Sequence, residues 1–333
     1  MTPPAPDIPE HSGRELVQIQ ADGLGDRMFA RYGGERLLER RWGERWLRLP
    51  LAQALPPGDD VRVRLKVHQD PVVPAESLHR SLQPSLARMR AHPHRHDGTL
   101  TALLSLQADE EGFVGAVAPV SYFHARCTEQ LLDASLDLRG QDQRVAGHLP
   151  DFSASMLACD IGVVVILETS DGATVVQRRG RHLDWRGGLL SASASGSLEP
   201  GRDFSGEWVA LDGLVAGARR ELAEEVGVGG ALDPQAHRLR MWSLGLWREL
   251  ARGGKPELYT AARTPLTFDE VVALQAHAPD AHESVQVTAM SRADVQALLD
   301  EVCARPTIDG LDLALVAGLL LRASHLSRGS ASE

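Results

Sequence analysis

Apolar and polar positions in the first half of the chain alternate in short runs separated by turn-forming residues. An apolar residue at every second position is typical of a strand with one buried face, and the runs that show it are 15–20, 61–67 and 99–107. Helical spacing occurs at 76–90 and 128–136, and a polar connection covers residues 139–150. The pattern predicts a smaller α+β domain over residues 15–150.

The pattern changes after residue 150. Residues 160–168, Asp-Ile-Gly-Val-Val-Val-Ile-Leu-Glu, form a nearly continuous β-branched run, as in a strand buried on both faces. A Thr-Ser-Asp-Gly turn follows, and residues 173–179 are expected to pair back as a hairpin. Further strands are expected at 240–246, 257–262 and 285–289, and helices at 212–226, 292–304 and 311–324. These elements predict an α/β domain over residues 151–323, with helices packed on a mixed sheet.

The two ends of the chain differ in composition from the middle. Residues 1–12 contain four prolines, and residues 324–333 are rich in serine and other polar residues. Such segments bury too little apolar surface to offset the entropy lost on folding. We expect flexible ends at 1–14 and 324–333.

The overall charge limits the class of partner. The formal net charge is −10, whereas DNA and RNA attract clusters of lysine and arginine. A nucleic acid polymer is therefore not an expected partner. A small phosphorylated ligand is compatible with an acidic protein, because a bound divalent cation supplies local positive charge.

Cysteines and membrane signals are sparse. The three cysteines, Cys127, Cys159 and Cys303, lack the spacing of a disulfide framework or a zinc ribbon. No basic segment followed by an apolar run opens the chain, and no stretch approaches the roughly 18 apolar residues of a membrane span. The expectation is a cytoplasmic protein with no membrane partner.

The helix expected at 212–226 has a clear apolar stripe. Wound at about 100° per residue, the apolar positions that share one face are Leu211, Val215, Ala218, Leu222 and Val226. Asp212 is placed to cap the start of the helix, and Gly227 is placed to end it in the left-handed conformation. The stripe is expected to pack on the sheet.

Three glutamates lie together along one edge of this stripe. Glu221, Glu224 and Glu225 are separated by at most four positions, so their side chains are neighbours on the helix surface. Like charges at this spacing destabilise an isolated helix by roughly 0.2–0.5 kcal/mol per pair. A hard divalent cation such as Mg²⁺ would relieve the repulsion. From spacing alone, the alternative is a solvated acidic face.

The full string around the glutamates favours the metal-binding interpretation. Residues 220–228 read Arg-Glu-Leu-Ala-Glu-Glu-Val-Gly-Val, which resembles the core of the Nudix box, Arg-Glu-aliphatic-x-Glu-Glu-x-Gly-aliphatic, at every fixed position. The resemblance covers residues 160–304 and implies the Nudix α/β/α sandwich and metal-dependent attack of water on a diphosphate. It also implies that Glu221, Glu224 and Glu225 bind Mg²⁺, with Mn²⁺ as an alternative, and that Arg220 orients them through a salt bridge.

The glycine half of the box has two alignments. The family pattern Gly-x5-Glu-x7 before the core gives Gly206 and Asp212, with Asp in place of Glu. Residues 195–201, Ser-Gly-Ser-Leu-Glu-Pro-Gly, look more like the usual loop but require an insertion over residues 204–210. We favour the second alignment. It makes Gly196 the loop glycine and leaves the first acidic residue unassigned.

Three residues outside the box are candidates for contact with substrate. Glu283 precedes the strand expected at 285–289 and is a candidate general base, with a box glutamate or a plain exposed loop acid as the alternatives. Arg178 and Arg179 end the first hairpin. They either bind phosphate or lie on an exposed turn.

The resemblance implies hydrolysis of a diphosphate linkage in a small nucleotide-like molecule. The preceding domain, Val-Ser-Tyr-Phe at 120–123 and Ala-His-Glu-Ser at 281–284 are together similar to the Nudix hydrolases that split UDP-glucose and UDP-galactose. ADP-ribose, dinucleotides and nucleoside triphosphates stay open as substrates. The alternative is a Nudix-fold sensor that binds a nucleotide without cleaving it. We expect the first domain to shape the substrate pocket or to mediate a homodimer.

Overall fold

The structure is a computed structural model of the chain. It describes residues 16–19, 29, 32, 34–73, 76–91, 96–134, 148–155, 157–182, 187–305 and 307–329. The flexible start expected at 1–14 lies outside these residues. The last helix continues to Gly329, so residues 324–329 of the expected flexible tail are helical and only residues 330–333 lie outside the described part.

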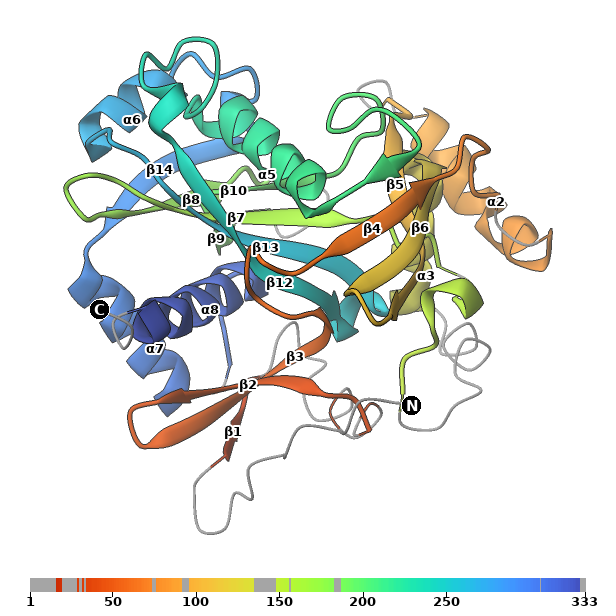
Figure 1. Cartoon of the computed structure of the whole chain (residues 1–333), viewed down its shortest axis with the longest axis horizontal. Coiled ribbons are helices and arrows are strands. Elements are labelled where there is room, and N and C mark those ends of the chain that lie inside the picture. The colour runs from red at the N-terminus through yellow and green to blue at the C-terminus, as the bar shows by residue number, and fades with distance from the viewer. Residues whose placement is uncertain are drawn as a thin grey trace.

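The elements form two sheets with helices on both (Figure 1). The strands are β1 (Leu16–Gln18), β2 (Leu37–Trp42), β3 (Arg45–Leu55), β4 (Val63–Val67), β5 (Thr99–Ala108), β6 (Phe113–Ser121), β7 (Gly162–Glu168), β8 (Thr174–Arg179), β9 (Leu190–Ser191), β10 (Ala194–Ser197), β11 (Trp208–Val209), β12 (Arg240–Glu249), β13 (Lys255–Arg263) and β14 (Ser284–Met290). The α-helices are α2 (Glu76–Ala91), α3 (Tyr122–Ala134), α5 (Leu211–Val226), α6 (Phe268–Gln275), α7 (Arg292–Ala304) and α8 (Leu313–Gly329), and 3-10 turns lie at η1 (Phe152–Ala154), η2 (Ala236–Arg238), η3 (Leu250–Arg252) and η4 (Ala281–Glu283).

The larger sheet is mixed and has ten strands within the described residues. Its main order is β1-β3-β12-β13-β7-β8-β14, with β2 on β3, β10 on β7 and β9 on β8. Strand β7 pairs in parallel with β13 along its whole length. On its other side, β10 pairs with residues 162–165 and β8 with residues 167–168. The division of this edge between two strands brings β10 beside the middle of the sheet.

Strand β7 is buried on both faces, as its β-branched run predicts. Val163 and Val165 belong to the core under α5, whereas Val164 and Ile166 belong to the core under α8, and each is at most 1% exposed. Helices α5 and α6 cover one face of the sheet, and α7 and α8 cover the other (Figure 1). The predicted α/β/α sandwich with a mixed sheet is confirmed.

The smaller sheet has the order β11-β4-β6-β5. Helices α2 and α3 accompany it and pack against each other through Leu86, Phe123 and Cys127. Strand β11 belongs to the second half of the chain and pairs with β4, while β3 of the first half pairs with β12 of the larger sheet. Hydrogen-bonded strands therefore cross the division at residue 150, and the independence of residues 15–150 stays a prediction.

The expected elements of the second half are largely present. The strands at 240–246, 257–262 and 285–289 correspond to β12, β13 and β14, and the helix at 292–304 is α7. The helix expected at 128–136 begins earlier, at Tyr122. The pattern does not predict the strands β2, β3, β6, β9, β10 and β11 or the helix α6. None of the described helices has both the length and the apolar content needed to cross a bilayer.

Helix α5 ends where the sequence predicts but starts differently. Gly227 has a φ of 80°, and its N–H donates to the carbonyl of Ala223 at 3.0 Å. The residue before the helix is Ala210, which has extended backbone and no side-chain cap. The capping role predicted for Asp212 is therefore wrong. Strand β11 runs directly into the helix, which places Asp212 in the first turn, where an acidic side chain still interacts favourably with the helix dipole.

Helix α8 approaches β7 closely at Gly318. A Cβ added at Gly318 would lie 2.7 Å from Cδ1 of Ile166. Alanine normally stabilises a helix interior by about 1 kcal/mol relative to glycine. We expect Gly318→Ala instead to lower the free energy of unfolding by roughly 1–3 kcal/mol, because it overpacks the core. Urea unfolding followed by circular dichroism measures the change.

A double-mutant cycle provides the control for this prediction. Ile166→Ala removes both atoms, Cδ1 and Cγ1, that the new methyl group would meet at 2.7 Å. The loss caused by Gly318→Ala should therefore be smaller in the Ile166→Ala background than in the wild type. A Gly318→Ala variant more stable than the wild type would contradict the close approach.

Candidate active site

Strand β10, helix α5 and the turn η4 border one cavity of about 400 Å³. Its acidic lining residues are Glu199, Glu221, Glu224, Glu225, Asp280 and Glu283, and its arginines are Arg126, Arg179, Arg202 and Arg220. Small-molecule sites have typical volumes of about 300–1,000 Å³. The glutamates of α5 thus border a cavity of ligand size rather than a freely solvated surface.

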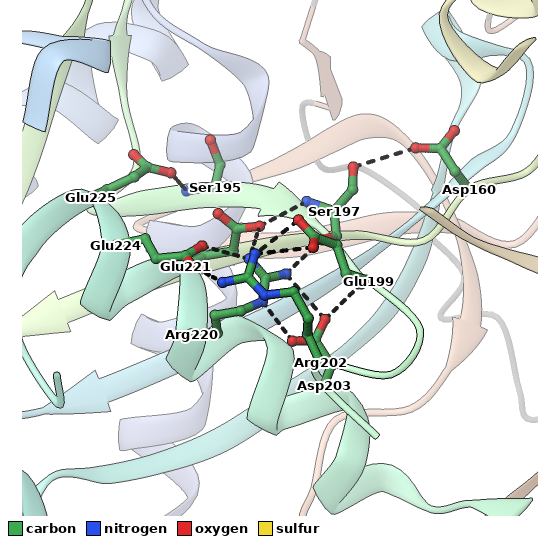
Figure 2. A network of polar contacts seen from close by, with 10 residues as sticks. All are labelled: Asp160, Ser195, Ser197, Glu199, Arg202, Asp203, Arg220, Glu221, Glu224 and Glu225. Atoms are coloured by element: carbon green, nitrogen blue, oxygen red, sulfur yellow. Dashed lines mark hydrogen bonds and ion pairs between the residues drawn. The ribbon is translucent and has the colours of Figure 1, made fainter. Parts of the chain in front are cut away.

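Strand β10 brings Gly196 against the carboxylate of Glu221. A Cβ at Gly196 would lie 2.0 Å from Cδ of Glu221, so any larger residue would displace that carboxylate. On either side, the backbone N–H of Ser197 donates to Glu221 Oε1 at 3.2 Å and that of Ser195 donates to Glu225 Oε1 at 2.8 Å (Figure 2). The strand therefore presents backbone donors to two of the three glutamates.

Gly206, the other candidate for the loop glycine, lies elsewhere. Its φ is 108°, and a Cβ added there would meet no atom within 4 Å. Asp212, its partner in that alignment, borders a different cavity together with Arg62 and Arg64. The geometry supports the alignment on Gly196.

Arg220 lies at the centre of an ion-pair network (Figure 2). Its Nε and Nη2 donate to the two oxygens of Asp203 at 2.6 and 3.0 Å, and its Nη1 donates to Glu221 at 2.9 Å and to Glu224 at 2.7 Å. The side chain is 13% exposed. Burial alone would lower its pKa, but the hydrogen bonds and charges of these carboxylates raise the pKa above its usual value. Arg220 is therefore a permanent cation between them.

Asp203 is a buried acidic residue in the loop between β10 and α5. Its side chain is 0% exposed, and it accepts the backbone N–H of Glu199 at 2.7 Å in addition to the two bonds from Arg220. Asp203 lies seven positions after Gly196, one more than the family spacing, so a fixed pattern misses it. The inserted segment then follows Asp203 and contains strand β11.

Glu224 has two cationic partners. Arg220 binds one of its oxygens, and Arg202 Nη2 donates to the other, Oε1. Arg202 also pairs with Glu199 at 3.0 Å. The charge of Glu224 is thus compensated within the protein, and a cation at its Oε1 would have to replace Arg202.

Glu225 is the most buried of the three box glutamates, with 4% exposure. Its Oε2 accepts a hydrogen bond from Nε2 of Gln177 at 3.1 Å. Gln177 is itself buried and lies on β8. The sequence analysis missed Gln177, although the two-residue period of a strand places it on the same face as Arg179.

The carboxyl groups of Glu221 and Glu225 both have raised pKa values. Burial raises the pKa of Glu221 to about 7, against the lowering effect of Arg220. Burial, followed by the charge of Glu221 and that of Glu283, raises the pKa of Glu225 well above its usual range, and Arg179 offsets only part of this. Burial, more than the neighbouring charges, therefore favours the protonated form of both carboxylates.

Glu283, the candidate base outside the box, borders the same cavity as the α5 glutamates. It lies in η4, is half-buried and lines the cavity. Its charge acts on both Glu221 and Glu225. The structure therefore brings Glu283 together with the α5 glutamates, although 58 positions separate it from Glu225.

The two hairpin arginines point in different directions. Arg179 lines the cavity, and its Nη1 donates to Oγ of Ser195 at 3.1 Å. Arg178 is exposed, donates to the carbonyl of Gly188 at 3.1 Å, and does not line the cavity. Alternation of side chains along a strand explains the difference. The position of Arg179 is compatible with contact to a phosphate. The position of Arg178 agrees with the alternative, an exposed residue on the turn.

The donor set fits a hard divalent cation without forming a complete cage. Within the described ranges, no three His, Cys, Asp or Glu side chains are arranged to hold an ion by themselves. Mg²⁺ usually keeps several waters and uses one or two carboxylates together with substrate phosphates. Glu221 and Glu225 offer two such oxygen donors, and the charge of Glu221 disfavours ionisation of Glu225. A cation between them would relieve that repulsion.

Comparisons with known proteins give distant similarities. No protein-family profile matches the chain, and no curated protein matches it. A solved structure of DR0079 from Deinococcus radiodurans is 16% identical with a TM-score of 0.32, covering 49% of this chain and 82% of that one. A MutT protein from Methanosarcina mazei Go1 is 16% identical with a TM-score of 0.29, covering 50% and 94%.

A third similar structure is RenU, a Nudix hydrolase from M. smegmatis. It is 14% identical with a TM-score of 0.27, and the match covers 52% of this chain and 88% of RenU. At such identities and TM-scores, a functional assignment has to rest on the chemistry of the site.

The contact between Gly196 and Glu221 predicts a strong effect of one methyl group. We expect Gly196→Ala to reduce turnover by roughly 100-fold or more, because small misplacement of a catalytic group has effects of this size. Thermal unfolding monitored by circular dichroism should show a folded variant. Turnover within a factor of three of the wild type would contradict a role for this close approach.

The raised pKa values predict how the stability of the metal-free protein depends on pH. Between the ordinary carboxyl pKa of 4.5 and about 7, the folded state binds more protons than the unfolded state, so stability falls as pH rises. In EDTA, we expect Glu225→Gln, which removes one buried charge, to lose less thermal stability than the wild type between about pH 5.5 and about pH 8. Differential scanning calorimetry measures both.

Mg²⁺ provides the matching control. It should raise the unfolding temperature of the wild type at about pH 8 more than that of Glu225→Gln, because a ligand stabilises only the form that binds it. Equal pH dependence in both proteins would show that the buried Glu225 charge has no such effect.

Proposed function

We propose that the chain is a Nudix-type hydrolase that cleaves a diphosphate linkage in a nucleoside diphosphate-linked small molecule. The observation that carries the proposal is the set of Glu221, Glu224 and Glu225 along one edge of α5, bordering a cavity of about 400 Å³ together with Arg220 and Glu283. The core of the Nudix-box resemblance, residues 220–228, contains the three glutamates and Arg220. Their convergence on one cavity supports it independently of the spacing in the sequence.

Mg²⁺, or alternatively Mn²⁺, is the proposed cofactor. Glu221 and Glu225 would hold it, with Glu224 as the third candidate ligand if Arg202 moves away from its Oε1. A bound divalent cation neutralises phosphate charge and acidifies the attacking water. The chain itself orients the ligands, because Arg220 and the N–H groups of Ser195 and Ser197 hold the carboxylates in place.

Glu283 is the proposed general base, and a box glutamate is the alternative. The oxygen of water forms a bond to one phosphorus, the bridging P–O bond breaks, and the proton released by the water passes to the carboxylate. Within the residues that the structure describes, Glu283 pairs with no arginine or lysine, and it lines the same cavity as the proposed metal ligands. A half-buried carboxylate in this position can accept the proton without leaving its turn.

The substrate class follows from the size of the cavity and from the resemblance. Nucleotide sugars such as UDP-glucose and UDP-galactose, ADP-ribose and dinucleotides all contain the required linkage and a larger organic group. A Nudix-fold sensor, which would bind such a ligand without cleaving it, is the alternative. Three glutamates beside a cavity of about 400 Å³ favour hydrolysis, because a sensor does not need them.

A substrate panel tests the proposal. The protein is incubated with Mg²⁺ and UDP-glucose, UDP-galactose, ADP-ribose, diadenosine compounds or nucleoside triphosphates, and products are identified by mass. We expect one class to be converted to monophosphate products, and Glu225→Gln to reduce turnover roughly 100-fold or more. Binding without any product would favour the sensor.

A matched control separates the site from general charge effects. Glu301→Gln makes the same chemical change on α7, where the side chain is 71% exposed. It should leave turnover unchanged within a factor of two. Equal losses in both variants would count against a specific role of Glu225.

A further inference from the structure

The cavity has a second wall that comes from the smaller sheet. From the smaller sheet and helix α3, the residues that line it are His96, Gly98, Thr99, Leu100, Tyr122 and Arg126. The last two lie in the first turns of α3, and the others lie at or just before the start of β5. None of these six residues belongs to the Nudix-box resemblance. The first half of the chain thus contributes side chains to a site whose carboxylates come from the second half.

This wall is held against the loop that carries Gly196 by backbone hydrogen bonds. The N–H of Thr101 on β5 donates to the carbonyl of Leu198 at 2.8 Å, and the N–H of Ile161 donates to the carbonyl of Thr101 at 2.8 Å. Leu198 follows directly after β10. Because main-chain bonds link the two walls, their side chains keep a defined separation rather than that of two loosely tethered domains.

Helix α3 is fixed at its start by Asp97. One carboxylate oxygen of Asp97 accepts the hydroxyl of Ser121 at 2.6 Å and the backbone N–H of Phe123 at 3.0 Å. The guanidinium of Arg126 then lies over the ring of Tyr122, with Cζ 5.3 Å from the ring centroid. The stacked pair restricts the orientation of both side chains. Arg126 and Tyr122 therefore form a preorganised edge of the cavity.

Arg126 of α3 and Arg179 of β8 line the same cavity. Both also line a smaller cavity of about 70 Å³ together with residues of β10. Arg179 donates from Nη1 to Ser195, and its buried Nε has no hydrogen-bond partner within the described part of the chain. A guanidinium with unused donors readily binds an anionic oxygen. Three of the four α5 residues that line the larger cavity are acidic, and Arg126 and Arg179 add positive charge to it.

We propose that Tyr122 and Arg126 are specificity-determining residues that bind the nucleoside diphosphate part of the substrate. Arg126, together with Arg179, contacts the phosphate oxygens that the α5 site does not hold, and Tyr122 packs against the planar base or the ribose. The inference rests on the proposed function for the reacting diphosphate. It adds that recognition of the organic group comes from the first half of the chain.

The charge distribution and the size of the cavity support this division of roles. A phosphate beside six acidic side chains requires compensation, and Arg126 supplies it from the wall that carries no acidic lining residue. A cavity of about 400 Å³ is larger than a bare diphosphate requires. Aromatic rings at nucleotide sites gain binding energy by stacking on bases of any identity.

Binding of non-hydrolysable ligands tests the proposal apart from catalysis. The ligands are the α,β-methylene analogues of ADP and UDP, with methylenediphosphonate as the counterpart that lacks a nucleoside, and calorimetry with the full chain and Mg²⁺ gives their dissociation constants. We expect Tyr122→Leu to weaken the better nucleoside analogue at least tenfold and methylenediphosphonate less than twofold. Tyr122→Phe, which keeps the ring, should stay within threefold of the wild type.

Arg126→Gln should weaken both kinds of ligand at least tenfold, since both present phosphonate oxygens. Arg90→Gln is the matched control, because Arg90 is exposed on α2 in the same unit and does not line the cavity. It should change neither dissociation constant. If Tyr122→Leu fails to fold, Arg126→Gln against Arg90→Gln decides the question alone.

The outcomes separate this inference from the proposed function. Unchanged binding in Arg126→Gln, or wild-type protein that binds neither nucleoside analogue, overturns the inference even if the substrate panel shows hydrolysis. The expected binding pattern in a protein that hydrolyses nothing supports the inference and overturns the proposed function. In a hydrolytically active protein, the same variants should raise KM for the substrate at least tenfold while kcat changes less than threefold.

Discussion

The site depends on one guanidinium that keeps mutually repelling carboxylates together. Arg220 binds Asp203, Glu221 and Glu224 at the same time, and of these three carboxylates Glu221 and Glu224 line the cavity. Its position requires the buried carboxylate of Asp203, because two parallel hydrogen bonds fix the plane of the guanidinium. Without a guanidinium fixed in this orientation, the glutamates on the edge of α5 would repel one another. With it, their carboxylate oxygens are held in defined positions.

Short strand β10 provides the second constraint. It occupies the half of the β7 edge that β8 leaves open, and it places a glycine where the carboxylate of Glu221 comes within contact of the main chain. The carboxylates are therefore held from two sides, by a side-chain cation and by backbone N–H groups. Such support from rigid elements is what a reacting geometry requires.

Local signals in the sequence identify helix α5 and its three glutamates. They do not show which strands pair when the strands are far apart in the sequence. The end of α5 at Gly227 and the three glutamates follow from helical spacing, because neighbours on a helix are set by the chain itself. Strand β3 and its pairing with β12 do not follow, since the two strands are almost 200 positions apart and an apolar pattern does not specify a partner. Asp203 is not predicted, because an insertion shifts its spacing from Gly196. Helix α6 is not predicted either, because it is short, although Thr267 and Glu270 form a capping box at its start.

Strand β11 gives the lengthened box a second attachment. Between the loop that carries Asp203 and the first turn of α5, the chain leaves the neighbourhood of the carboxylates and hydrogen-bonds to β4 in the smaller sheet through Trp208 and Val209. The segment 196–227 is therefore not structurally independent of the smaller sheet. A transplant of residues 196–227 into another scaffold would carry an unpaired strand with it, and this segment can evolve only in step with a sheet built from the opposite half of the molecule.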